Sequence, residues 1–75
     1  MLEQVKKVIM DAISVEEELI TPQARLSEDL GIDSLSAVEL SLELETEFDI
    51  RIEDEEISAL VTVQDILDLV NSKKQ

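Results

Sequence analysis

The residue best placed for chemistry in this sequence is a serine at the start of a predicted helix. The run Gly31-Ile32-Asp33-Ser34-Leu35 puts the Ser34 hydroxyl in a first helical turn, where backbone N–H groups have no partner and the helix dipole is positive. An attached phosphate is stable at such a position, although a plain capping serine is the simpler interpretation. We expect no catalysis by Ser34 itself, because the chain has no His and no Gly-x-Ser-x-Gly turn. The chain is therefore predicted not to be an enzyme.

Composition narrows the possible functions further. The 75 residues include no Cys and no His, which excludes disulfides and thiolate nucleophiles and removes the commonest transition-metal ligands, so no metal site is expected. The formal net charge of −13 argues against binding to nucleic acid or to anionic membrane surfaces. Apolar runs are short, and residues 1–13 lack the apolar core of a signal peptide. We therefore expect a cytoplasmic protein without membrane insertion.

Hydrophobic periodicity predicts an all-α fold with a single domain over residues 1–75. Helices are predicted over residues 2–13, 34–48 and 54–60 and from just after residue 62. The period is lost between residues 14 and 33, a segment that we expect to be pinned to the core by its spaced apolar residues, Leu19, Ile20, Leu26, Leu30 and Ile32. The predicted architecture is a small four-helix bundle of three longer helices and one short third helix, with a long ordered loop between helices one and two.

Nearly all of the negative charge lies between residues 28 and 56, which hold 12 acidic residues and a single basic one. On a helical projection of residues 34–48, Leu35, Val38 and Leu42 form a second apolar strip outside the core stripe. Glutamates border this strip, among them Glu39 and Glu45. Two interpretations are open: a solvated face, or a docking surface for a partner that presents Arg and Lys around an apolar pocket. Docking is favoured, because self-repulsion across this span costs stability that nothing within the span offsets.

A set of short motifs occurs at fixed spacings along the chain. It comprises Val5-Lys6-Lys7-Val8-Ile9, Glu28-Asp29-Leu30-Gly31, Asp33-Ser34-Leu35, Val38-Glu39-Leu40, Leu44-Glu45, Glu47-Phe48-Asp49, Ile52-Glu53-Asp54-Glu55-Glu56 and Thr62-Val63-Gln64-Asp65. Any one of these motifs recurs by chance, but the ordered set, together with the length and the acidity, is specific. Over essentially the whole chain, the sequence closely resembles the acyl carrier proteins.

This resemblance implies that Ser34 carries 4′-phosphopantetheine through a phosphodiester, installed from coenzyme A by a phosphopantetheinyl transferase (holo-acyl-carrier-protein synthase). The thiol of that group would hold acyl intermediates as thioesters for the enzymes of fatty acid biosynthesis. The resemblance further implies an acyl pocket whose lining includes Leu44, Ile52 and Leu60. Basic patches of the partner enzymes would dock on Asp33, Leu35, Val38, Glu39, Leu42, Glu45, Asp54 and Glu55. The chain is expected to act as a monomer.

Two alternatives stay open from the sequence alone. One keeps the carrier chemistry but changes the pathway, to polyketide synthesis or another specialised acyl transfer. The other is an unmodified acidic helical adaptor. The chain also departs from the family at Glu53, where many relatives have Pro, and a looser turn is expected before the third helix.

Overall fold

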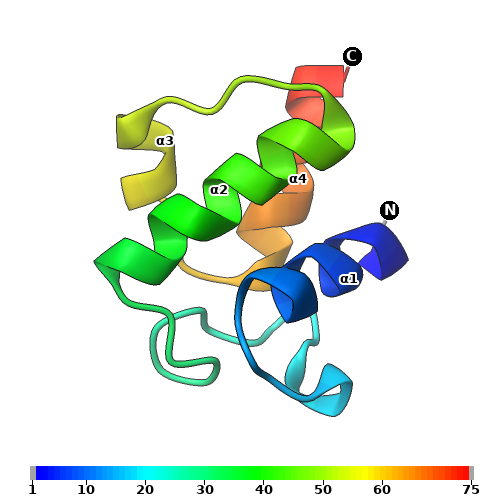
Figure 1. Cartoon of the computed structure of the whole chain (residues 1–75), viewed down its shortest axis with the longest axis vertical. Helices are drawn as coiled ribbons and strands as arrows, with labels where there is room; N and C mark the ends of the chain where they lie inside the picture. The colour runs from blue at the N-terminus through cyan, green and yellow to red at the C-terminus, as the bar shows by residue number, and fades with distance from the viewer. Residues whose placement is uncertain (1, 75) are drawn as a thin grey trace.

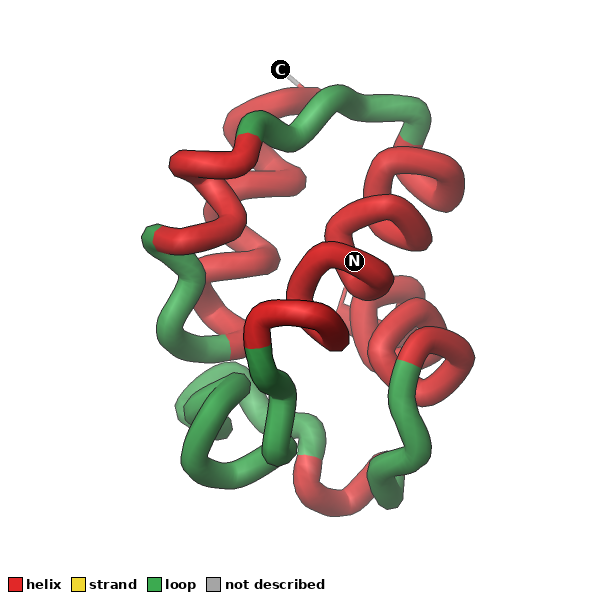
Figure 2. The backbone as a smooth tube through the Cα atoms, turned by 60° about the vertical axis from the view of Figure 1, so that its left-hand side comes forward, coloured by secondary structure: helices red, strands yellow, loops and turns green. Residues whose placement is uncertain are grey.

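The computed structural model of the chain describes residues 2–74 and confirms the predicted helical bundle (Figure 1). Its helices are α1 (Leu2–Ala12), α2 (Ser34–Phe48), α3 (Asp54–Ser58) and α4 (Val63–Lys74), with one short 3₁₀ helix, η1 (Glu17–Leu19). None of the helices among these residues is long and apolar enough to cross a membrane. The three longer helices surround a shared core, and the segment between α1 and α2 folds at one end of the bundle (Figures 1 and 2).

The core is built from one apolar face of each longer helix. These faces follow the three- and four-residue spacing that brings side chains to one side of a helix. Their buried members are Val5, Val8 and Ile9 of α1, Leu40, Leu44 and Phe48 of α2, and Val63, Ile66 and Val70 of α4. Because α2 packs closely on α1, its core stripe is fixed and its opposite side is left to solvent.

Local sequence signals define both ends of α2. The Asp33 carboxylate accepts a hydrogen bond from the Ser36 N–H at 2.8 Å and so caps the first turn. Gly31, with φ of 68°, lies in the left-handed region that glycine adopts without steric cost, which lets the chain turn into the helix. Asp49 ends the helix in the same left-handed region, with φ of 54°. The predicted bounds of residues 34–48 are therefore confirmed.

The long segment between α1 and α2 is ordered by contacts with the start of α4. Ile20, Leu26, Leu30 and Ile32 are buried as predicted, but Leu19 is 50% exposed, because it lies in η1 at the surface. Three backbone hydrogen bonds join the segment to residues 61–64. The Leu26 N–H donates to the Val61 carbonyl at 2.9 Å, the Val63 N–H to the Ala24 carbonyl at 3.0 Å and the Gln64 N–H to the Pro22 carbonyl at 2.9 Å. The segment is thus part of the folded body.

Two predicted helix ends differ from the structure. The first helix ends one residue early, at Ala12, although Ile13 N–H still bonds to the Ile9 carbonyl at 2.9 Å. The third helix ends at Ser58 instead of residue 60. The N–H groups that follow bond to carbonyls three residues earlier, as in a 3₁₀ turn; the Leu60 N–H, for example, donates to the Ile57 carbonyl at 3.1 Å. The chain therefore leaves α3 through a tight turn.

Candidate functional site

Ser34 is the first residue of α2, and its side chain is exposed. It follows Asp33, whose carboxylate is occupied with capping the helix. The hydrogen bonds from the Ser36 backbone and hydroxyl lower the pKa of the Asp33 carboxyl below its ordinary value. Asp33 therefore keeps its charge and its capping position, and the Ser34 hydroxyl stands free of the core beside the N–H groups of the first turn.

A groove of about 690 Å³ lies between α2, α3 and the loop before α2, and Ser34 is one of its lining residues. Its lining includes Ser34, Ala37, Leu40 and Leu44 from α2. It also includes Ile57 from α3 and Leu60 from the turn after α3. Most of these side chains are apolar, and Ile57 and Leu60 pack against the main core. The groove therefore offers a mainly apolar surface beside the exposed Ser34 hydroxyl.

The predicted pocket residues take different places. Leu44 is fully buried and Leu60 is half-buried, and both line the groove. Ile52 is 7% exposed but is not among the lining residues. It belongs to the core at the other end of α3, where the Glu45 carboxylate holds its backbone N–H at 2.8 Å. The structure thus brings Leu44 and Leu60 together at the groove and leaves Ile52 outside it.

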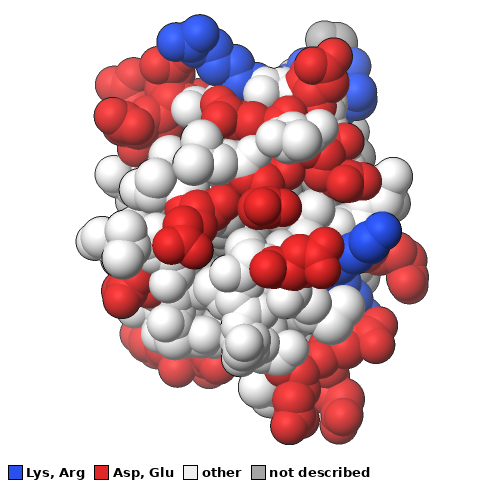
Figure 3. Space-filling model, viewed as in Figure 1, with Lys and Arg blue, Asp and Glu red and all other residues white. Residues whose placement is uncertain are grey.

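The predicted docking face of α2 is exposed to solvent. Leu35, Val38 and Leu42 have exposed fractions of 70%, 47% and 57%, which are large for apolar side chains on a protein of this size. Glu39 is exposed beside them. Figure 3 shows acidic side chains across this face, with uncharged surface between them and basic side chains near the edges. The face combines an apolar strip with negative charge, as the helical projection predicted.

The other predicted docking residues are less uniform. Asp54 and Glu55 are exposed in the first turn of α3, and Asp54 also lines the groove. Glu45 is half-buried, because its carboxylate is turned toward the Ile52 backbone. Glu45 therefore has a structural contact that sequence reasoning missed, and a docking role for it stays a prediction.

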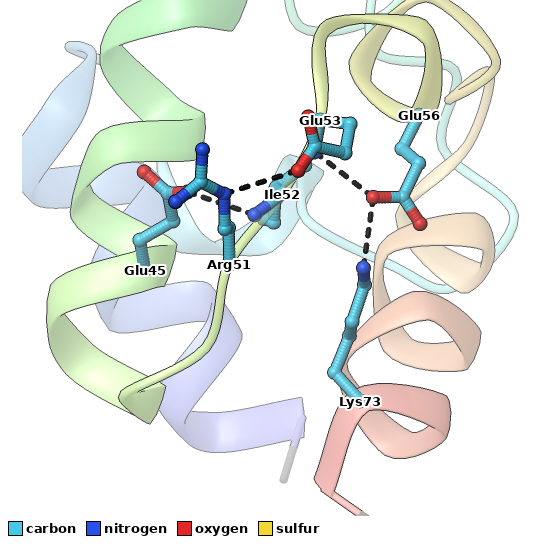
Figure 4. Close-up of polar contacts among 6 residues, drawn as sticks. All are labelled: Glu45, Arg51, Ile52, Glu53, Glu56 and Lys73. Carbon is cyan, nitrogen blue, oxygen red and sulfur yellow. Dashed lines mark hydrogen bonds and ion pairs between the residues drawn. The ribbon is translucent and has the colours of Figure 1, made fainter.

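Sequence reasoning also missed the polar contacts around α3. The Glu56 backbone N–H donates to the Glu53 carbonyl at 3.0 Å, and the Glu56 side chain accepts a hydrogen bond from the Glu53 N–H at 2.9 Å. This cap holds the turn that was expected to be loose, and the Glu-x-x-Glu spacing was its signal. The same Glu56 carboxylate contacts Lys73 of α4 (Figure 4).

Ser41 is a polar residue buried within α2, with 4% of its surface exposed. Its hydroxyl donates a hydrogen bond to the Val38 carbonyl at 2.7 Å.

Metal binding has no support in the part of the chain that the structure describes. Within residues 2–74, no group of three or more His, Cys, Asp or Glu side chains is arranged to hold a metal ion. The many carboxylates are spread over the surface, so their charge acts as an extended field.

Comparisons with known proteins agree with this geometry. The family model described as "Phosphopantetheine attachment site" matches residues 3–70. An acyl carrier protein of Thermosynechococcus vestitus is 50% identical over 72 residues, which cover 96% of this chain and 89% of that protein. The chain is thus a phosphopantetheine-binding domain by class. Within that class, it belongs to the acyl carrier proteins.

Proposed function

We propose that Ser34 is the attachment residue for 4′-phosphopantetheine and that the chain carries acyl groups to the enzymes of fatty acid biosynthesis in the cytoplasm. The observation that carries this proposal is the exposed serine at the N-terminus of α2, which lines a mainly apolar groove, in a chain that matches a phosphopantetheine attachment family. The alternative of an unmodified adaptor leaves the groove and the exposed hydroxyl without a role.

The residues around Ser34 fit this group. A phosphodiester on the Ser34 oxygen is placed at the positive end of the α2 dipole, next to N–H groups of the first turn. When bound, the group supplies the thiol that carries an acyl chain as a thioester, a function that this chain, without Cys, does not have by itself. Because Asp33 already caps the helix, the serine oxygen is available for attachment without loss of the cap.

The groove then shelters the acyl chain. Leu40 and Leu44 of α2 line the same space as Ile57, Leu60 and Ser34. Each methylene group moved from water into such an apolar space contributes about 0.8 kcal/mol, so the free energy favours an inserted chain over an exposed one. The residues of the chain thus bind, orient and shield the cargo, and they do not take part in its chemistry.

The acidic face of α2 is the surface on which partner enzymes dock. We propose that phosphopantetheinyl transferase and the fatty acid synthesis enzymes present Arg and Lys to Glu39 and its neighbours and an apolar pocket to Leu35, Val38 and Leu42. Such complementary charge raises the rate of encounter and sets the orientation more than it raises affinity. The chain acts as a monomer, so that this face stays free between encounters.

The attachment residue is tested by incubating the protein with coenzyme A, Mg²⁺ and a phosphopantetheinyl transferase and measuring the intact mass. The native sequence is expected to gain one phosphopantetheinyl group, and Ser34→Ala none. Ser36→Ala, two positions along the same helix turn, is the matched control and is expected to gain the group as the native sequence does. A gain in Ser34→Ala would reject this site.

A further inference from the structure

The α3 helix is the wall of the groove that is least attached to the core. It has five residues, Asp54–Ser58, and none of them is fully buried. A helix of this length is not stable by itself in water. Nevertheless, Asp54, Ile57 and Ser58 line the groove. Contacts from outside α3 therefore determine where this wall stands.

The last turn of α4 supplies such a contact through Lys73. Its ammonium nitrogen lies 2.8 Å from Oε1 of Glu56, which is 17 positions earlier in the chain (Figure 4). The same oxygen accepts the Glu53 N–H at 2.9 Å and so closes the N-terminal cap of α3. A single carboxylate oxygen thus connects the first turn of α3 to α4.

This ion pair differs from the other two found among residues 2–74. The Lys73 and Glu56 side chains are 28% and 29% exposed, whereas the pairs of Arg25 and Arg51 with nearby glutamates have exposures of 51% or more. Those two pairs join residues two or three positions apart, and water and salt screen them. The Lys73–Glu56 pair is more shielded from water, and it joins α4 to α3. It therefore restrains the position of α3, whereas each of the other two pairs joins only residues close together in the sequence.

The α4 helix is a firm anchor for this contact. Ile66 and Val70 have no exposed surface, so α4 is fixed to the core. The neighbouring Lys74 donates a hydrogen bond to the Phe48 carbonyl at the C-terminal end of α2, at 3.1 Å. Two consecutive lysines therefore tie the end of α4 to both helices that line the groove.

We propose that Lys73 is a positioning residue that fixes α3 through Glu56 and thereby sets how long an acyl chain the groove shelters. This inference rests on the proposed function, because it concerns the cargo of the same groove. With the pair intact, α3 stands close to α2 and the groove fits a chain of limited length. Without the pair, α3 moves outward more easily, admits longer chains and holds short chains less closely.

The first test needs no cargo. Amide hydrogen exchange is measured on the unmodified protein and on Lys73→Met, which removes the charge but keeps an unbranched apolar side chain. We expect roughly fivefold faster exchange at the amides of Ile57, Ala59 and Leu60, with those of α2 and α4 unchanged. Lys73→Arg is expected to restore slow exchange. Lys7→Met, which removes the same charge from an exposed position on α1 away from α3, is the matched control and is expected to leave exchange as it was.

The second test uses the loaded carrier. The melting temperature is measured for the native sequence and Lys73→Met with butanoyl, octanoyl and hexadecanoyl groups attached. Lys73→Met is expected to lose the stabilisation given by butanoyl and octanoyl while keeping that given by hexadecanoyl. Unchanged α3 exchange, or an equal shift of melting temperature at all three lengths, would overturn the positioning role and leave the carrier function intact. A native carrier whose melting temperature ignores its cargo would overturn the positioning role and the sheltering groove, whereas a carrier that cannot be loaded at all would overturn the proposed function.

Discussion

The carboxylate of Glu45 accepts a hydrogen bond from the backbone N–H of Ile52 at 2.8 Å and so joins the last turn of α2 to the segment that leads into α3. This contact spans the connection after Phe48, where the chain has no regular structure until Asp54. Glu45 therefore stabilises the approach to α3 as well as adding charge to the α2 face.

A first prediction concerns the stability given by this contact. Glu45→Ala leaves the backbone N–H of the buried Ile52 without its charged acceptor, and we expect the free energy of unfolding to fall by about 1–2 kcal/mol. Glu43→Ala, which removes an exposed carboxylate from the same helix, is the control and is expected to change it by less than about 0.5 kcal/mol. Urea unfolding followed by far-UV circular dichroism measures both. Equal effects of the two changes would show that the bond contributes nothing.

A second prediction concerns the docking face. Glu39→Lys reverses an exposed charge next to Leu35 and Val38 and leaves the core untouched. We expect kcat/KM of a partner enzyme for the acyl carrier to fall roughly fivefold, mainly through KM, with the effect fading at high salt. Glu17→Lys makes the same charge change in η1, away from α2, and is expected to alter the rate little. If both variants behaved alike, general charge and not this face would govern the encounter.

A third prediction follows from the lowered pKa of Asp33. Because the folded state favours the charged carboxylate, the cap stabilises the fold above the ordinary pKa of the group and loses this effect as the pH falls through the lower folded pKa. The stability difference between the native sequence and Asp33→Ala should therefore be constant near neutral pH and shrink as the pH falls below the ordinary pKa of an aspartate. Urea unfolding at several pH values measures it. A difference that is independent of pH would mean that the charge of Asp33 does not contribute.

A fourth prediction concerns the charge of residues 28–56. These residues hold 12 acids and one base, and only a few of their carboxylates have a basic partner. Added NaCl or millimolar MgCl₂ is expected to raise the melting temperature, because counterions screen the repulsion. A melting temperature that stays constant or falls as salt is added would contradict this account.

Local signals made much of the fold predictable. Asp33 caps α2 where the sequence placed the start of a helix, and Thr62 and Asp65 exchange bonds at the start of α4 at 3.3 and 3.1 Å. Such caps depend on residues within one turn, so a sequence pattern contains them. The exposed strip of Leu35, Val38 and Leu42 was predictable for the same reason, since helical periodicity decides which side chains leave the core.

Contacts between distant segments were not predictable. The backbone bonds from Leu26 and Val63 that order the long loop involve no special side chain, so no pattern marks them. The inward turn of Glu45 depends on the path of the chain after α2, and a helical projection of α2 alone places this carboxylate on the outer face. The pair of Lys73 and Glu56 likewise depends on how α4 passes α3, which the sequence does not state.

The central claim is that Ser34 carries the phosphopantetheine, and fragmentation mass spectrometry of the modified carrier tests it most directly. The protein is modified with coenzyme A by a transferase, digested, and fragmented to locate the added mass on a single residue. We predict that the whole of the added mass lies on Ser34. Added mass on Ser36 or on any other residue, with Ser34 unmodified, would contradict the account.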